Sequence, residues 1–541
     1  MKYAVLKLSG AYRETGPAVP SILSTRTDRQ FRFDHFLIRV EHILASGKIS
    51  TVIIDCAHDF HTMLAGGTES VREQLERLTG SGRTTIFYAA EYGPVQIYLA
   101  SACSRRMMHP LGTLSFLGLS RSFLFFKPAA DKLGVESTVV RRGRYKSAGD
   151  RFRTDRMDPF NREQYERYLH GAVREMGKKI TAGTGKTEGD LNELIGGRIL
   201  SAESAVEEGW VHEVRTSSQL RREWKQQKHR NRSLKKARRS FGRGRKKIAV
   251  LVFEGAIIDG KSKRHPLLGQ AVGAESFLPH VHKLTDDSSV KGVVLRINSG
   301  GGSAAASEDI LNALSELGKK KPLVVSMSEV AASGGYWISC GAERIFAQAN
   351  TLTGSIGVIS LHLALQNLLK RYGINAESLR TGPHADLGSA LRSITEEEKK
   401  MLDGTVEHIY RTFIRKVADA RSRDPRQVEK AAAGRVWSGI DALQESLVDE
   451  VGGLVQAIDH LKNRLGLPKA KIVFYPKIKR SLVERLLERE SGDDLAVAAE
   501  EMTGEHYSLQ LMKVLFRDTT GLTAPLVLLP EGTLWTGGIT W

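Results

Sequence analysis

The stretch LVVSMSEVAASGGYWISCGAERIFAQANTLTGSIGVIS, which covers residues 323–360, decides the fold because its pattern occurs twice in the chain. Residues 84–120 read TTIFYAAEYGPVQIYLASACSRRMMHPLGTLSFLGLS. When the two stretches are aligned, Tyr98 falls on Tyr336, and Gly112 and Gly118 close the same apolar pattern as Gly354 and Gly357. Similarity repeated at a long spacing indicates a duplicated structural unit, so we predict a tandem repeat.

Each copy passes from a short apolar run through a turn into a second apolar segment. In the later copy, residues 323–327 predict a buried strand, and AASGG leads into a helix that we expect to begin near Tyr336. Ser333 therefore lies at or near a helix start, where free N–H groups and the helix dipole favour a developing negative charge. A serine nucleophile is one interpretation, and a tight turn of small residues is the other.

The match between the copies extends well beyond this turn. Both halves run into a long helical region, at 162–179 and 396–422, and GRILSAESAVEEGWVHEV resembles GRVWSGIDALQESLVDEV near the two ends. Strands alternating with helices predict parallel α/β units. We predict an N-terminal domain at 1–214, a polybasic linker at 215–247, a second domain at 248–465 and a C-terminal extension at 466–541.

The composition is that of a folded protein, with 26% charged and 41% hydrophobic residues among 541. The three cysteines include no CxxC pair, which argues against a disulfide framework and a cysteine zinc site and favours a reducing compartment. No run of eighteen apolar residues predicts a membrane-spanning helix, although a membrane anchor upstream of Met1 stays open. We expect a cytoplasmic location.

Most of the net charge of +19 lies in one segment. Residues 215–247 hold fifteen Lys or Arg against one Glu, a net charge of +14. This segment is either a solvated linker or a strip that contacts anionic lipid or nucleic acid. Trp224 and Phe241 are its only aromatic residues, too few for a base-stacking platform, so we expect no nucleic acid and favour a linker with peripheral contact to an anionic membrane.

Each copy carries one reactive residue that the other lacks. Val95 stands at the position of Ser333, and aligning RRGRYKSAGD with RTGPHADLGS places Lys146 opposite Ala385. Such complementary losses predict that Ser333 and Lys146 meet in one site between the domains. His384 is a weaker candidate partner for the serine, because a polar histidine in a turn is usually solvated.

Four motifs in order resemble the signal peptide peptidase A family in its long, two-domain form: YKSAGD, LRINSGGGSAAASE, AASGGYWIS and TLTGSIGV. The resemblance implies tandem Clp/crotonase-like α/β domains. It also implies a serine endopeptidase with a Ser-Lys dyad that cleaves released signal peptides, or other short apolar or unfolded peptides, through an acyl-enzyme. Homo-oligomers, commonly tetramers, are implied as well.

The resemblance assigns roles to five residues of this chain. Ser333 would be the nucleophile and Lys146 the general base, Ser355 would orient the lysine, and the N–H groups of Gly334 and Gly301 would bind the oxyanion. A free lysine has a pKa near 10.4, so Lys146 can act as a base only if burial lowers its pKa by about three units.

Two positions depart from the family pattern. Gly300 replaces the proline that usually precedes the paired glycines, which we expect to loosen the loop that carries Gly301. Ser328 and Glu329 stand where the family commonly has glycines.

No metal or nucleotide cofactor is expected. The GTGKT at 183–187 lacks the earlier glycine of a phosphate-binding loop, since that position is Ile180, and we interpret it as a connection after a helix.

Two other functions stay open. A crotonase-like enzyme would act on acyl-CoA thioesters, and a catalytically impaired scaffold would use the basic segment at a membrane.

Overall fold

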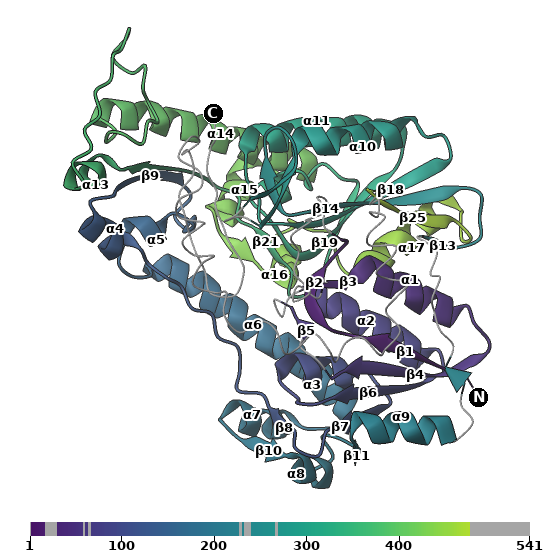
Figure 1. Cartoon of the computed structure of the whole chain (residues 1–541). Coiled ribbons are helices and arrows are strands. Elements are labelled where there is room, and N and C mark those ends of the chain that lie inside the picture. Colours follow the sequence, from purple (N-terminus) through teal and green to yellow (C-terminus); the bar gives the residue numbers. More distant parts are fainter. Residues whose placement is uncertain are drawn as a thin grey trace.

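Apolar runs in both halves of the chain form two separate sheets. The computed structural model of the protein describes residues 2–16, 30–57, 60–62, 66–226, 230–231, 240–265 and 269–476. In each sheet the long strands are parallel, and helices connect and cover them (Figure 1). The prediction of two parallel α/β units is therefore confirmed.

The first unit has a six-stranded parallel sheet in the order β11-β7-β6-β4-β1-β12. Its strands are β1 (Lys2–Lys7), β4 (Ile49–Cys56), β6 (Thr84–Ala89), β7 (Arg105–Met108), β11 (Glu213–Val214) and β12 (Arg230–Asn231). Its helices are α1 (Phe33–Leu44), α2 (Gly66–Gly80), α3 (Pro94–Ala100), α6 (Pro159–Thr184), α7 (Glu188–Ile195), α8 (Ala202–Glu207) and α9 (Ser217–Gln226). Short strands at its margins are β2 (Gly10–Arg13), β3 (Gln30–Arg32), β5 (Phe60–His61), β8 (Thr113–Ser115) and β10 (Ile199–Ser201).

The second unit has a nine-stranded sheet with the main order β13-β25-β14-β18-β19-β20-β24. Its strands are β13 (Ser240–Phe241), β14 (Lys247–Glu254), β18 (Val290–Ser299), β19 (Leu323–Ala332), β20 (Arg344–Ala347), β21 (Leu352–Gly354), β23 (Val436–Trp437), β24 (Glu450–Val451) and β25 (Lys471–Tyr475). Its helices are α10 (Ala274–Asp286), α11 (Ala304–Lys320), α12 (Gly334–Trp337), α14 (Glu396–Arg421), α15 (Pro425–Ala432), α16 (Gly439–Gln444) and α17 (Leu454–Leu465). A small sheet beside it contains β15 (Ala256–Ile258), β16 (Lys263–His265) and β17 (Gly269–Gly273).

The two sheets have the same topology. The order β11-β7-β6-β4-β1 in the first sheet corresponds to β24-β20-β19-β18-β14 in the second. The duplication that the sequence predicts is thus present in the arrangement of the strands. The two long helices are also where the sequence predicts them, and the connection around GTGKT joins α6 to α7.

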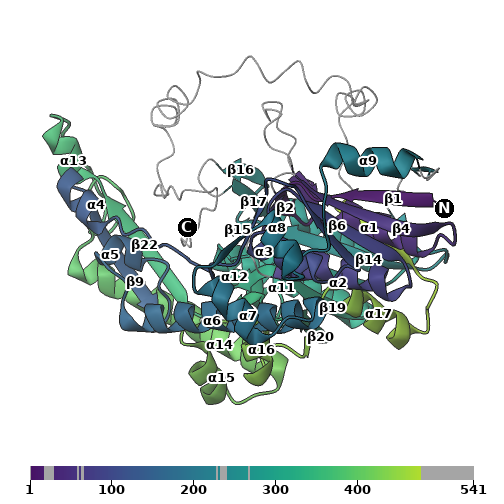
Figure 2. The same cartoon turned by 90° about the horizontal axis from the view of Figure 1, so that it is seen from below.

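An arm projects from the body and is built from both copies. Strand β9 (Glu136–Arg142) pairs antiparallel with β22 (Val358–Ala364), and Figure 2 shows this pair extending away from both sheets. Helices α4 (Lys127–Leu133), α5 (Asp150–Arg153) and α13 (Gln366–Arg371) lie beside it. Because β9 comes from the first copy and β22 from the second, the pairing carries the residues after β9 to the second unit.

A polar cluster is buried where the two units meet. Arg296 of β18 and Glu14, which follows β2, form an ion pair at 3.0 Å with side chains 0% and 1% exposed. Ser328 of β19 also accepts a hydrogen bond from Arg296, at 3.0 Å. The unusual serine that the sequence shows at this position therefore contributes to the contact between the units.

The predicted domain boundaries need two corrections. The second unit does not end at 465, because β25 pairs in parallel with β14 inside its sheet. Part of the predicted linker at 215–247 is regular structure, since it includes α9 and strands β12 and β13 at the sheet edges. Residues 227–229 and 232–239 of that segment, and 477–541 of the predicted extension, lie outside the described residues. Within the described part of the chain, no helix has the length and apolar character needed to cross a bilayer.

Candidate active site

Ser333 lies in a strained turn between a buried strand and a short helix. Strand β19 runs to Ala332, and α12 begins at Gly334, earlier than the start near Tyr336 that the sequence predicts. Ser333 has φ 55° and ψ −120°, a conformation that costs a non-glycine residue energy and is typical of functional sites. Its N–H donates to the carbonyl of Gly354 at 2.9 Å, which holds the turn in place.

Lys146 comes from the first copy, in the loop between β9 and α5. The N–H of Tyr145 donates to the carbonyl of Ala433 at 2.9 Å, which fixes this loop on the second copy. Lys146 also lies close to Gly434 of the second copy. A Cβ added to Gly434 would be only 2.6 Å from the Cβ of Lys146. Gln164 of α6 adds a bridge, because its amide nitrogen donates to the Tyr145 carbonyl at 3.1 Å and its oxygen accepts the N–H of Val436 at 3.0 Å.

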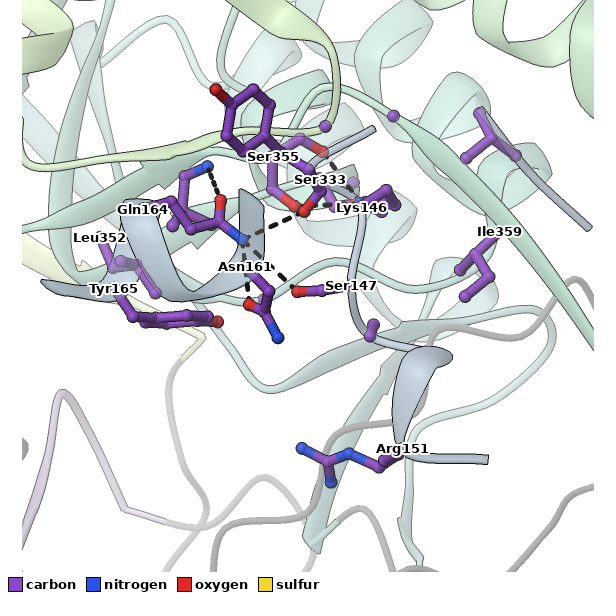
Figure 3. A pocket seen from close by; sticks show the side chains of 18 of the residues that line it. Lys146, Ser147, Arg151, Asn161, Gln164, Tyr165, Ser333, Leu352, Ser355 and Ile359 are labelled. Carbon is purple, nitrogen blue, oxygen red and sulfur yellow. Dashed lines mark hydrogen bonds between the residues drawn. The ribbon is translucent and has the colours of Figure 1, made fainter. Parts of the chain in front are cut away.

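The lysine side chain ends between two serines of the second copy. Its Nζ donates to Ser333 Oγ at 2.8 Å, to the Ser355 carbonyl at 2.9 Å and to Ser355 Oγ at 3.1 Å (Figure 3). Ser355 also has a positive φ of 52°, and its N–H donates to the Arg435 carbonyl at 2.6 Å. The structure thus brings together the three side chains that the sequence analysis singled out.

Burial sets the protonation of Lys146. The residue is only 5% exposed, and burial lowers the pKa of its amine to about 7. Its three hydrogen-bond acceptors are hydroxyl or carbonyl oxygens, which leave the amine without a carboxylate to stabilise its charge. A substantial fraction of Lys146 is therefore neutral near pH 7 and able to accept a proton.

The two N–H groups predicted to bind the oxyanion, those of Gly334 and Gly301, differ in their hydrogen bonding. Gly334 begins helix α12, so its N–H is one of the groups that a helix leaves without an internal partner. Gly301 lies against this turn, and an added Cβ there would be 2.6 Å from the Gly334 nitrogen. However, the N–H of Gly301 donates to Ser299 Oγ at 3.1 Å. Sequence reasoning missed Ser299, which only the loop geometry reveals.

The other candidate from the sequence, His384, lies elsewhere. Its Nδ1 is 3.3 Å from Glu398 Oε1, in an ionic cluster with Arg392 at the start of α14. The described contacts of His384 include neither Ser333 nor Lys146. The structure therefore places His384 beside two carboxylates at the start of α14.

A cleft with a largely apolar wall opens beside the two reactive side chains. It is lined by the glycine turn and by aromatic and aliphatic side chains: Phe123, Leu124, Phe125, Tyr165, Trp337, Leu352, Val358, Ile359, Ile409 and Phe413. Two arginines, Arg121 and Arg151, also line it. An extended apolar chain that lies in this cleft would pass Ser333.

The fold and the site together define a tandem α/β protein in which a lysine of one copy donates a hydrogen bond to a serine of the other. The chain belongs to peptidase family S49, whose model matches residues 81–231 and 315–467. Each match covers a large part of one copy, which agrees with the duplication.

Three curated proteins that are similar to this chain over most of its length carry protease names. It is 31% identical over 432 residues to "Serine protease SPPA, chloroplastic" of Arabidopsis thaliana, an alignment that covers 77% of this chain and 63% of the plant protein. It is 33% identical to "Protease 4" of Haemophilus influenzae, with 71% and 65% covered, and 33% identical to "Protease 4" of Salmonella typhi, with 72% and 65% covered. The chain thus spans slightly less than two thirds of the length of these relatives.

Proposed function

We propose that the protein is a serine endopeptidase in which Ser333 is the nucleophile and Lys146 the general base. The observation that carries the proposal is the 2.8 Å hydrogen bond between Lys146 Nζ and Ser333 Oγ, made by an amine whose pKa is lowered to about 7 by burial. A serine hydroxyl needs an adjacent base to become nucleophilic, and a lysine can serve only when it is neutral. Family membership supports the same reaction.

In the proposed mechanism, neutral Lys146 takes the hydroxyl proton as Ser333 Oγ attacks the peptide carbonyl. The Gly334 N–H stabilises the oxyanion, and the Gly301 N–H joins it by exchanging its bond to Ser299 for one to the substrate. Collapse of this intermediate breaks the C–N bond, and protonated Lys146 gives its proton to the leaving amine. Water, deprotonated by Lys146, then attacks the ester and releases the acid and Ser333.

Ser355 is proposed to orient the lysine. Its carbonyl and hydroxyl both accept hydrogen bonds from Nζ, so two of the three directions around the nitrogen are fixed and the third points to Ser333. A general base held in this way needs little reorganisation when the substrate arrives.

The proposed substrates are short apolar or unfolded peptides, such as released signal peptides. The apolar wall of the cleft supports this class, and a site between two units admits an extended chain more readily than a folded surface. An acyl-CoA thioester is the alternative substrate. Hydrolysis of a thioester in preference to every peptide tested would favour it.

Self-association and peripheral membrane contact are also proposed. Exposed apolar side chains on the arm, at Leu133, Tyr372, Ile374 and Leu379, support a homo-oligomer, for which light scattering is the test. The basic residues of 215–247 support contact with an anionic leaflet.

The membrane proposal predicts salt-dependent binding to vesicles that contain phosphatidylserine. Each basic residue near an anionic surface contributes about 1 kcal/mol at low salt, so replacing the basic residues of 232–239 by glutamine should weaken binding at least about tenfold. Co-sedimentation measures it. Equal binding by the two proteins, or binding that salt does not weaken, would count against the proposal.

The proposed function predicts that Gly434→Ala impairs hydrolysis of a quenched fluorescent apolar peptide that the wild type cleaves. Gly434 has φ +77°, and the added Cβ would press on Lys146, so the amine should move relative to Ser333. A displacement of about 1 Å can lower a catalytic rate about a hundredfold. Gly404→Ala in α14 is the control, since an added Cβ there meets nothing within 4 Å.

Circular dichroism checks that both variants fold, so that a loss of activity in Gly434→Ala can be assigned to a displaced Lys146. Gly404→Ala should retain wild-type activity. Wild-type rates in a folded Gly434→Ala would argue against the lysine position proposed here, and a correctly folded wild type that cleaves no peptide would overturn the peptidase proposal.

A further inference from the structure

Two positive side chains, Arg121 and Arg151, line the cleft. Among the residues that the structure describes, Arg121 and Arg151 form no ion pair with a carboxylate. The Nη1 atom of Arg151 is buried and has no hydrogen-bond partner there. A buried donor that loses its water without replacement costs free energy, so its presence at a cleft suggests a partner that arrives with a ligand.

The carboxylate next to Arg151 is already engaged. Asp150 precedes it in helix α5 and pairs with Arg141 at 2.9 Å and with Arg153 at 2.9 Å. Arg151 therefore differs from both of these arginines near it. In Figure 3 its side chain extends from α5 toward the side of the view on which Asn161 and Tyr165 lie.

The second guanidinium rests on the aromatic wall of the same cleft. Arg121 lies 5.4 Å from the ring centre of Phe123 and 5.1 Å from that of Tyr165, whose rings are themselves 4.6 Å apart. Stacking of this kind orients a guanidinium and leaves its edge free to donate. The segment that carries Arg121 is tied to α5, because the N–H of Phe126 donates to the Arg151 carbonyl at 2.6 Å.

The charges act on one another across the cleft. Burial lowers the pKa of the Arg151 guanidinium, and the positive charge of Arg121 lowers it further, while Tyr165 acts in the opposite direction. An anion placed between the two guanidiniums would offset both the burial of Arg151 and the repulsion from Arg121. A carboxylate suits this position because it can accept two parallel hydrogen bonds from one guanidinium.

We infer that Arg151 and Arg121 form a subsite that binds a carboxylate of the peptide substrate. The inference rests on the proposed function and narrows its substrate class from apolar peptides to apolar peptides with a nearby negative charge. Lys146 and Arg151 lie five positions apart in one short segment, and both line the cleft. The carboxylate is either the free C-terminus of a short peptide or an acidic side chain.

The test compares peptides that differ only in this charge. One apolar quenched fluorescent sequence is made with a free C-terminal acid, with a C-terminal amide, and as amides that carry either Glu or Gln at one position on the C-terminal side. Each is assayed with the wild type, Arg151→Met, Arg121→Met and Arg153→Met. Arg153→Met is the matched control, because Arg153 is on the same helix but pairs with Asp150.

The wild type should cleave one of the acidic peptides with a kcat/KM roughly 10- to 100-fold above that of its neutral partner, since hydrogen bonds to charged groups contribute this much. Arg151→Met should remove most of the preference for the acidic peptide, whereas Arg153→Met should keep that preference and change cleavage of the neutral peptides less than about threefold. The acid and amide pair identifies a C-terminal subsite, and the Glu and Gln pair identifies a side-chain subsite.

Equal cleavage of charged and neutral peptides by the wild type would overturn the inference and leave the proposed function intact. The same holds if Arg151→Met slows all peptides equally, as a purely structural role requires. If no peptide is cleaved, the proposed function fails, and fluorescence anisotropy of labelled peptides on Ser333→Ala still decides whether the acid binds more tightly than the amide. If Arg151→Met does not fold, Arg121→Met carries the comparison at an exposed position.

Discussion

Lys146→Met is expected to lower the rate of peptide hydrolysis by about 10³- to 10⁶-fold, and Ser333→Ala by a similar factor. Methionine keeps most of the volume and the flexible chain of lysine, so the cavity between the units stays filled while the base is lost. The double variant should be no slower than either single variant, because a nucleophile and its base act as one unit.

Ser355→Ala serves as the graded comparison. It removes one of the two Ser355 acceptors and leaves the carbonyl, so its effect should be smaller, about tenfold. The rates come from a quenched peptide, with circular dichroism and thermal unfolding to check each fold. A folded Lys146→Met that retains a tenth of wild-type activity would mean that another group takes the proton.

Arg296→Met is expected to destabilise the protein by about 3–5 kcal/mol, the usual cost of breaking a fully buried ion pair. The variant leaves Glu14 buried without its cation, and it also removes the donors to Ser326 and Ser70. Because Glu14 belongs to the first unit and Arg296 to the second, the loss should weaken the contact between the units.

Chemical denaturation measures this effect against a surface pair. Lys319→Met breaks the pair with Glu316, whose side chains are 70% and 66% exposed, and should change stability by less than about 0.5 kcal/mol. Adding Glu14→Gln to Arg296→Met should recover part of the loss, since it removes the unpaired charge. A denaturation midpoint of Arg296→Met equal to that of Lys319→Met would contradict the role given to the buried pair.

The duplication made much of the fold predictable from the sequence. Period and spacing predicted the parallel strands and the long helices, and the comparison of the two copies showed where each had lost a reactive residue. That comparison singled out Lys146 and Ser333 although 187 positions separate them in the sequence. In the structure, Lys146 Nζ lies 2.8 Å from Ser333 Oγ. The alignment could do this because both residues occupy positions defined by the repeat.

Features that depend on pairing between distant segments could not be predicted in this way. Neither β9 nor β22 carries a signal that names its partner, and the short β25 resembles an apolar run in a tail. The serine at position 328, where the family commonly has glycine, is explained only by its contact with the Arg296–Glu14 ion pair, whose residues come from other parts of the chain. Side-chain direction is similarly absent from the sequence, so Ser299 and Arg151 were missed.

The central claim is that Lys146, whose amine is partly neutral near pH 7, is the base for Ser333. The pH dependence of kcat/KM tests this claim most directly. Because a protonated amine cannot accept a proton, the rate should be low in acid and rise with a single-proton slope through an apparent pKa of about 7. The same rise should appear in the variant His384→Gln, because in the wild type the His384 ring contacts Glu398 and not Ser333. A rate that is constant from pH 6 to 9, or a rise that disappears in His384→Gln, would contradict the account.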